Sequence, residues 1–226
     1  MSHFCRKTCA IIICGYKEIE TFKAPELLRE KGMKDMKLYH YSVDSYQGGG
    51  HLINDYKNHY QFAEPYILAL RESGEVFRAV YFATMYMSRE IKSLGLRKYE
   101  NFRKDAVEGI FEYVRETEFP HDTSRLRCVY YCESKQEAIA YAKDDCLSDG
   151  LFIKDQVFLL EVEVEDGSIR RYDQSFFNSA SEAIEKNDID AVFAYARQYF
   201  SCKRSDHPLI EIVADGDNNV LRRIEF

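Results

Sequence analysis

The chain has 226 residues, of which 46% are hydrophobic and 31% are charged, a composition typical of a globular protein with a sizeable core. Its formal net charge of −7 argues against a protein that coats nucleic acid through bulk electrostatics. No stretch approaches the roughly 20 consecutive apolar residues of a membrane span. We therefore expect a protein without a membrane segment, which acts in the cytoplasm or is delivered into a host cytoplasm.

The seven cysteines and six histidines form no pattern that indicates a metal site or a disulfide framework. The cysteines are odd in number and irregularly spaced, which favours reduced thiols. The histidines belong to no HExxH motif and to no Cys/His quartet. We therefore expect no bound metal.

The first clear strand is Lys37–Ser42, which Met36 precedes directly. The apolar run Ala10–Cys14 near the start of the chain is too short for the hydrophobic region of a signal peptide. We therefore expect residues 1–35 to form an N-terminal extension or cap, ahead of a single domain over residues 36–226.

A Gly- and Asn-rich stretch at residues 43–60 reads as a long loop, and a helical pattern follows it. Apolar residues recur at intervals of three and four up to about Glu118, which predicts two or three helices. This helical insertion at about residues 60–118 could be a lid, a platform for an acceptor or a partner surface. The alternative is a helical layer that simply buries one face of a sheet.

The second half of the chain alternates between strands and helices. Glu161 and Glu163 alternate with apolar residues, so we expect both in solvent. The predicted elements are, in chain order, a strand at Leu126–Tyr131, a helix at Lys135–Asp145 capped by Ser134, a strand at Val157–Val164 closed by an Asp166–Gly167 turn, a helix at Asp188–Phe200, and strands at Leu209–Ala214 and Val220–Phe226. A hairpin-like turn at Asp215–Asn219 joins the last two strands.

Strands scattered in this way favour an α+β fold over a doubly wound parallel sheet. The sequence also lacks the GxGxxG and GxxxxGK[ST] loops that bind dinucleotides and nucleotide phosphates in such sheets.

Three short motifs contain candidate functional residues. Taken alone, His40 on the first strand reads as a structural side chain, and Tyr130 and Tyr141 read as core aromatics of a β-α unit. Glu211 is more informative, because it lies inside the apolar strand PLIEIV. An ionised carboxylate there is costly unless it is paired or lies at a cavity.

The order of these motifs resembles the His-Tyr-Glu branch of the ADP-ribosyltransferases, the branch that contains the poly(ADP-ribose) polymerases and diphtheria toxin. LYHYS is similar to the first strand of that family. VYYCESKQEAIAY is similar to its strand-to-helix element, in which a second tyrosine follows the first after eleven positions. PLIEIVADGDNNVLRRIEF is similar to its closing strands, which contain the catalytic glutamate. The resemblance implies a split mixed or antiparallel sheet with flanking helices, into which the helical insertion is added after the first strand.

The resemblance also implies a role for each motif residue. His40 would bind the adenosine ribose of NAD, with Ser42 nearby, and the backbone of Tyr41 would contact the carboxamide. Tyr130 and Tyr141 would sandwich the nicotinamide ring, since electron-rich rings hold a flat cation well. Glu211 would stabilise the positive charge that develops on the ribose.

Two further features bear on these roles. Arg125 lies just before the tyrosine strand and could contact the NAD pyrophosphate, because a guanidinium matches phosphate oxygens; a surface arginine is the alternative. Tyr41 stands where the resembling family has glycine, so its backbone contact can persist but its ring must point elsewhere. Ala138 stands where many members have a serine that binds the amide oxygen, so we expect nicotinamide to be held more weakly.

The sequence therefore predicts a mono-ADP-ribosyltransferase that cleaves NAD as a co-substrate. The expected acceptor is a macromolecule, either protein or RNA/DNA, and the expected setting is a bacterial toxin, effector or anti-phage defence factor, with an antitoxin or immunity protein as a further partner. The alternatives are an NAD glycohydrolase and a catalytically inactive module that keeps the fold for binding.

Overall fold

The computed structural model describes residues 36–42, 52, 57–90, 96–143, 157–164 and 169–225, all within the compact unit Met33–Phe226. The strands are β1 (Met36–Ser42), β2 (Val129–Tyr131), β3 (Phe158–Val164), β4 (Ile169–Asp173), β5 (Ile210–Ala214) and β6 (Asn218–Ile224). The helices are α1 (Lys57–Glu72), α2 (Gly74–Glu90), α3 (Leu96–Glu118), α4 (Lys135–Ala142), α5 (Ser175–Glu185) and α6 (Ile189–Phe200).

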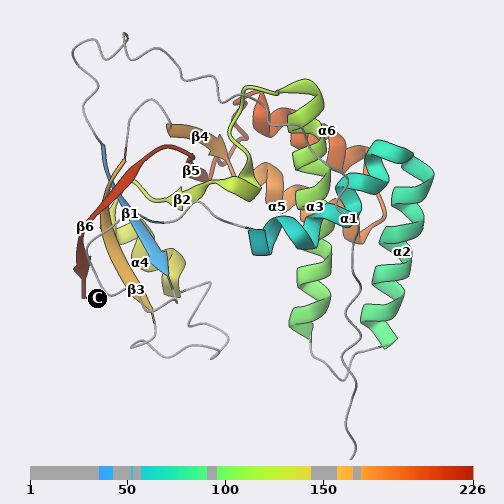
Figure 1. Ribbon diagram of the computed structural model, residues 1–226, viewed down its shortest axis with the longest axis horizontal. Helices are drawn as coiled ribbons and strands as arrows, with labels where there is room; N and C mark the ends of the chain where they lie inside the picture. Colours follow the sequence, from blue (N-terminus) through green and yellow to red (C-terminus); the bar gives the residue numbers. More distant parts are fainter. Residues whose placement is uncertain are drawn as a thin grey trace, which may run out of the picture. The chain divides into compact units, whose positions relative to one another are not determined.

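The strands form two antiparallel three-stranded sheets, in the orders β1-β3-β6 and β2-β5-β4 (Figure 1). One bridge joins the sheets, since Tyr39 on β1 and Cys132 after β2 exchange backbone hydrogen bonds of 3.0 and 2.8 Å. Across this bridge the full strand order is β4-β5-β2-β1-β3-β6. The α+β expectation is confirmed.

The two sheets share a small apolar core. Leu38 and Leu160 from one sheet lie in the same buried cluster as Val129, Tyr131 and Ile212 from the other. Because side chains alternate across a strand, the neighbours of these residues point to the opposite faces. The junction of β1 and β2 is therefore packed on one side by side chains from both sheets.

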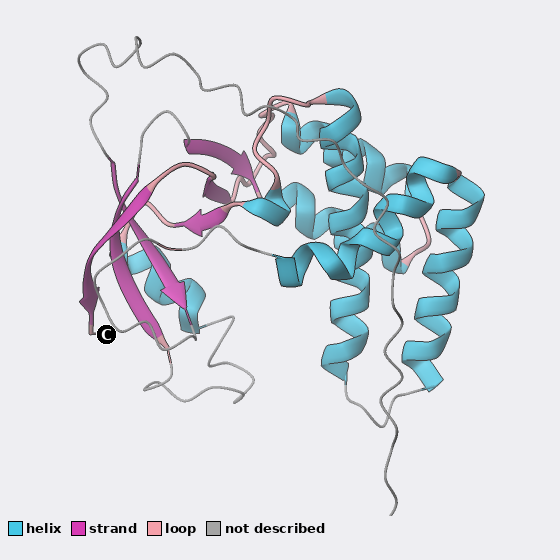
Figure 2. Ribbon diagram, in the orientation of Figure 1, coloured by secondary structure: helices cyan, strands magenta, loops and turns pink. Residues whose placement is uncertain are grey.

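The larger core lies among the helices. The two or three helices predicted between about residues 60 and 118 are confirmed as α1, α2 and α3; helices are cyan in Figure 2. The apolar residues of α3 recur at the expected helical period. Five of them are fully buried: Ala106, Val107, Ile110, Phe111 and Val114. A Cβ at Gly109 would lie 2.7 Å from the Cβ of Tyr66, so glycine permits the close approach of α1 and α3. None of the described helices is long and apolar enough to cross a membrane.

Helix α4 begins at the predicted residue. The Ser134 hydroxyl accepts from the backbone N–H of Glu137 at 3.2 Å, and the Glu137 carboxylate accepts from the N–H of Ser134 at 3.1 Å. This reciprocal pair satisfies two amide groups that the first helical turn leaves without partners. The predicted Ser134 cap is confirmed.

Several boundaries differ from the predicted ones. Arg125–Arg127 forms a short 3-10 helix, because the Ser124 hydroxyl accepts from the N–H of Leu126 at 3.2 Å, and β2 starts only at Val129. The sequence reading missed β4 and most of α5.

The predicted hairpin between the last two strands is wrong. Both edges of β5 are taken, by β2 on one side and by β4 on the other. The chain after β5 therefore leaves that sheet, and β6 pairs with β3 in the other sheet.

The expectation that Glu161 lies in solvent is also wrong. Only 6% of its surface is exposed, and its carboxylate lies 2.7 Å from Arg222 and 3.7 Å from Lys37. Both cations lie on strands next to β3, and their positive charges compensate the buried negative charge of Glu161. Glu163 is half-buried. Three predictions concern residues that lie outside the described part of the chain: the N-terminal extension over residues 1–35, the Asp166–Gly167 turn and most of the Gly-rich loop. Within that loop only Leu52 and the start of α1 are described.

The carboxylate of Asp173 anchors the segment that leads into β5. It accepts from Ser175 (Oγ at 2.6 Å and N at 3.1 Å) and from the backbone N–H groups of Ser205 (2.7 Å) and Leu209 (3.0 Å). Burial raises the pKa of this carboxyl, but the hydrogen bonds outweigh it and lower the pKa from 3.8 to about 2.

Because the folded pKa lies below the unfolded one, the ionised Asp173 stabilises the fold above the unfolded pKa, and the contribution is lost as the pH falls through the folded pKa. We expect Asp173→Asn to lower the free energy of unfolding by about 2 kcal/mol near neutral pH. Urea denaturation between about pH 5 and pH 2 should show a smaller loss of stability in the variant than in the wild type. Equal losses in the two proteins would contradict this role of Asp173.

Candidate functional site

Strand β2 joins the two sheets, and it brings the three motif residues onto adjacent strands. His40 lies on β1, Tyr130 on β2 and Glu211 on β5, and the strand order places β2 between the other two. Residues that are 90 and 81 positions apart in the chain thus lie on adjacent strands, but their side chains do not share one face. His40 lies on the side of Leu38 and Tyr131. Tyr130 and Glu211 point to the opposite side, toward the helices. This arrangement makes the junction of β1, β2 and β5 the candidate site.

The His40 ring is held by the backbone of β2. Its Nδ1 lies 2.8 Å from the carbonyl oxygen of Tyr130. A carbonyl only accepts hydrogen bonds, so Nδ1 carries the proton and Nε2 carries the acceptor lone pair. The His40 ring lies at the edge of Tyr131, with 6.0 Å between centroids, and it is stacked at 6.4 Å with Tyr41. The side chain of Tyr41 therefore packs beside the histidine.

Burial lowers the pKa of His40 below its ordinary value of 6.5, and the hydrogen bond to the Tyr130 carbonyl only partly opposes this. We expect His40 to be neutral near pH 7 and to titrate below 6.5 in a ¹⁵N-¹H NMR titration, with the proton on Nδ1. Because the folded pKa is lowered, protonating His40 in acid should destabilise the fold. A His40 resonance that titrates above 6.5, or that shows the Nε2–H tautomer, would contradict this geometry.

Glu211 lies on the face of its sheet that packs against the helices. Its partner on β4 is Tyr172, while Val213, two residues along, is paired with Tyr130. Paired residues in an antiparallel sheet share a face, so Glu211 and Tyr130 point to the same side. Only 7% of Glu211 is exposed.

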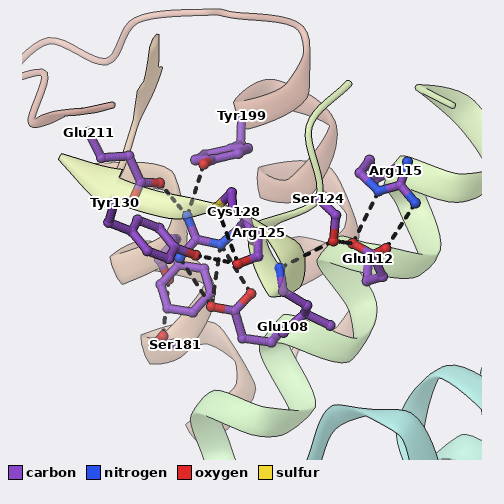
Figure 3. Close-up of polar contacts among 12 residues, drawn as sticks. Glu108, Glu112, Arg115, Ser124, Arg125, Cys128, Tyr130, Ser181, Tyr199 and Glu211 are labelled. Atoms are coloured by element: carbon purple, nitrogen blue, oxygen red, sulfur yellow. Dashed lines mark hydrogen bonds and ion pairs between the residues drawn. The ribbon is translucent and has the colours of Figure 1, made fainter. Parts of the chain in front are cut away.

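The Glu211 carboxylate forms an ion pair with the guanidinium of Arg125 (Figure 3). Burial raises the pKa of Glu211, whereas the charge of Arg125 and a hydrogen bond with Tyr199 lower it, and the charge of Glu108 raises it further. The net effect is a raised pKa. Glu211 therefore binds a proton more readily than an exposed glutamate does.

Arg125 is the centre of this cluster. The carboxylate of Glu108, from α3, lies 3.1 Å from Nε and 3.1 Å from Nη2, while Nη1 donates to the Tyr199 hydroxyl at 2.9 Å. Aromatic rings surround the guanidinium carbon, with centroid distances of 4.2 Å for Phe177, 5.1 Å for Tyr199 and 5.3 Å for Tyr130. Such rings attract a cation and exclude water.

The structure corrects the predictions for Arg125. Only 6% of the residue is exposed, so the surface alternative is wrong. The role in binding pyrophosphate is not supported either, because Glu108, Glu211 and Tyr199 already occupy the guanidinium donors. The groups that Arg125 binds in the structure come from the protein itself.

The two tyrosines of the predicted slot lie on different elements. The Arg125 guanidinium lies over the ring of Tyr130, whose hydroxyl donates to the Arg125 carbonyl at 2.9 Å. Tyr141 is half-buried in the last turn of α4, a helix that packs against β1. Arg125 thus occupies one face of the Tyr130 ring. Ser42 is the last residue of β1 and is half-buried.

Sequence reasoning missed the acidic residues that α3 contributes. Glu108 binds Arg125, and Glu112, one turn later, accepts from Arg115 at 2.9 Å and from the Ser124 hydroxyl at 2.9 Å (Figure 3). The sequence does contain a signal for Glu112, which directly follows the core residues Ile110 and Phe111. A carboxylate flanked by core positions needs a partner. Tyr199 gave no such signal, because a buried tyrosine is ordinary in an apolar helix face.

A small hollow of about 270 Å³ lies beside the junction and is lined by Glu133, Glu137, Arg171, Arg204 and Ile210. Ile210 precedes Glu211 on β5, so their side chains point to opposite faces. The Glu211 carboxylate does not line this hollow. Among the described residues, no group of three or more His, Cys, Asp or Glu side chains could hold a metal ion.

Comparison with protein families matches residues 34–226 to a family described as "Protein of unknown function (DUF2441)". No curated protein matches the chain.

Proposed function

The chain belongs to the DUF2441 family, and we propose that it is an NAD-dependent mono-ADP-ribosyltransferase. The observation that carries this proposal is that His40, Tyr130 and Glu211 lie on the adjacent strands β1, β2 and β5, with the side chain of His40 on one side of the junction and those of Tyr130 and Glu211 on the other. The order of these residues along the chain is the order that the motif resemblance requires. The split of the sheet between β1 and β2, with one bridge across it, supports the same fold assignment.

The geometry at His40 suits a ribose ligand. With its proton fixed on Nδ1 by the Tyr130 carbonyl, His40 presents Nε2 as an acceptor for a ribose hydroxyl. A neutral imidazole is required for that role, and burial keeps His40 neutral at physiological pH. Tyr41 and Ser42 continue β1 beyond this residue, and the proposed backbone contact to the carboxamide comes from Tyr41.

The cluster around Glu211 suits a reaction that develops positive charge. With both carboxylates ionised, Glu108, Arg125 and Glu211 together have one excess negative charge. In the proposed reaction the bond between the ribose C1′ and the nicotinamide nitrogen breaks, nicotinamide leaves with the bonding electrons, and the sugar becomes an oxocarbenium-like cation. A fixed carboxylate stabilises that cation more than the ground state, which lowers the barrier. The acceptor atom then forms the new bond to C1′ and loses its proton.

The acceptor and the biological setting are further parts of the proposal. A protein acceptor suits the net charge of −7 better than RNA or DNA does. A toxin, effector or anti-phage defence factor would also need an antitoxin or immunity partner to protect the cell that makes it.

A second candidate function, an inactive binding module with the same fold, is favoured by one observation. Glu211 is 7% exposed and is paired with Arg125, which is also the arrangement of a structural buried ion pair. NAD binding to this site would have to move at least one side chain of the cluster to expose the carboxylate.

One experiment separates the candidates. The purified full chain is incubated with NAD labelled on the adenine ring, with and without cell lysate. The proposal expects label on macromolecules only when lysate is present, because ADP-ribose is transferred to an acceptor. Free labelled ADP-ribose from the purified protein alone would identify an NAD glycohydrolase. No product in either reaction, together with no increase in melting temperature when NAD is added, would identify a module that does not use NAD.

A further inference from the structure

The helical insertion contacts the arginine that binds the Glu211 carboxylate. Arg125 contacts Glu211 on one side, and Glu108 of α3 engages the other side of the same guanidinium at 3.1 Å. Glu108 retains some exposure (18% of its side chain), whereas Arg125 and Glu211 are almost fully covered. The insertion is therefore connected to the proposed catalytic carboxylate through one arginine.

The geometry of Arg125 leaves it little freedom. A guanidinium is planar and has five donors in a fixed fork, and here three different residues accept from four of them. The Phe177 ring at 4.2 Å and the Tyr130 ring at 5.3 Å restrict its tilt. A carboxylate bound to such a group is held in one orientation, which is the requirement for a group that must stabilise charge at a defined atom.

We infer that Arg125 is a positioning residue for Glu211 and that Glu108 orients Arg125, so that helix α3 of the insertion helps to build the active site. This inference rests on the proposed function and deepens it. It assigns the insertion a task beyond covering a sheet face: Arg125 holds Oε1 of Glu211 while another side chain of the cluster moves to expose the carboxylate to NAD.

Glu108 also affects the acidity of Glu211, because the two carboxylates carry like charges on either side of Arg125. The groups that face Glu211 are Arg125, Glu108 from α3, Tyr199 from α6, and Tyr130 and Cys128 from the chain around β2. Removing the charge of Glu108 removes a like charge that raises the pKa of Glu211, and it leaves Arg125 to Glu211 alone. The pKa of Glu211 should then fall.

The test compares Glu108→Gln with Glu112→Gln. Both glutamates lie on α3, one turn apart, and each binds an arginine, but Glu112 binds Arg115 and Ser124 and does not contact Arg125 in the described structure. For Glu108→Gln we expect about a tenfold lower kcat for NAD cleavage with an unchanged KM, since the carboxylate is misoriented but NAD contacts remain. The acid limb of the pH profile should move to lower pH. Glu112→Gln should leave the position of that limb unchanged.

A second readout does not require activity. In protein labelled with ¹³C at glutamate side chains, the Glu211 carboxyl signal is assigned by its loss in Glu211→Gln and is followed through a pH titration. It should titrate at lower pH in Glu108→Gln than in Glu112→Gln. If Glu108→Gln does not fold, Arg125→Lys gives the same test with the opposite sign. The donors of a lysine lie on a single nitrogen, which cannot span Glu108, Tyr199 and Glu211 as the planar guanidinium does, so the Glu211 pKa should rise.

The outcomes are distinguishable. A wild type without NAD turnover would refute the proposed function, while the NMR titration would still decide whether Glu108 acts on Glu211. Equal Glu211 titrations in Glu108→Gln and Glu112→Gln would overturn the inference. A higher kcat in Glu108→Gln or in Arg125→Lys would also overturn it, since the arginine would then block Glu211.

Discussion

Replacing Glu211 with glutamine is expected to slow NAD cleavage by about 10²- to 10³-fold. Glutamine keeps the size of the side chain but lacks the negative charge that would stabilise the oxocarbenium-like sugar in the proposed reaction. The interaction acts mainly in the transition state, so kcat should fall while KM for NAD changes little. Release of nicotinamide, measured by chromatography over a fixed time, gives the rate for each protein.

The matched control is Glu163→Gln. Glu163 lies on a strand, as Glu211 does, and is half-buried, but it belongs to the other sheet and is not part of the Arg125 cluster. Its substitution should leave nicotinamide release unchanged. Nicotinamide release by Glu211→Gln at the wild-type rate would mean that this carboxylate is not catalytic.

Replacing Arg125 with methionine is expected to lower the free energy of unfolding by about 3–5 kcal/mol. Methionine has a similar length and is apolar, but it leaves the carboxylates of Glu108 and Glu211 without their shared cation. Glu211 would then be a buried, unpaired charge, or it would have to bind a proton. Urea denaturation near neutral pH measures the loss.

The exposed ion pair of Arg197 provides the comparison. Arg197 contacts Glu118 at 2.9 Å through two nitrogens, but 51% of its side chain is exposed. Its replacement by methionine should cost only about 0.2–1 kcal/mol. Combining Arg125→Met with Glu108→Gln and Glu211→Gln should recover part of the loss, because the unpaired charges are then gone. Similar costs for Arg125→Met and Arg197→Met would contradict the account of the buried cluster.

Local patterns predicted the elements whose stability is local. The period of α3, the Ser134 cap of α4 and the apolar run of β3 all follow from residues within a few positions of one another. The end of the chain did not follow from such patterns. The turn after Ala214 is compatible with a hairpin, and only the pairing of β5 with both β2 and β4 directs β6 to the other sheet.

The candidate site was likewise predictable only where its signal lies within a few residues of the chain. The buried carboxylate of Glu211 could be recognised because an acid inside an apolar strand needs a partner. The identity of that partner could not, since Arg125 lies 86 positions before Glu211 and 17 positions after Glu108. Arg125 is predicted near the NAD pyrophosphate because a guanidinium matches phosphate oxygens, but a guanidinium pairs with carboxylates in the same bidentate way. Only the fold selects between the two.

The central claim is that NAD binds at the junction of β1, β2 and β5, and a crystal structure of Glu211→Gln with NAD tests it most directly. The variant should bind NAD without cleaving it. We expect the nicotinamide ring against Tyr130 and Tyr141, a ribose hydroxyl within hydrogen-bonding distance of His40 Nε2, and residue 211 facing the ribose that bears nicotinamide. NAD bound away from His40 and Tyr130, or crystals without NAD after soaking, would contradict the claim.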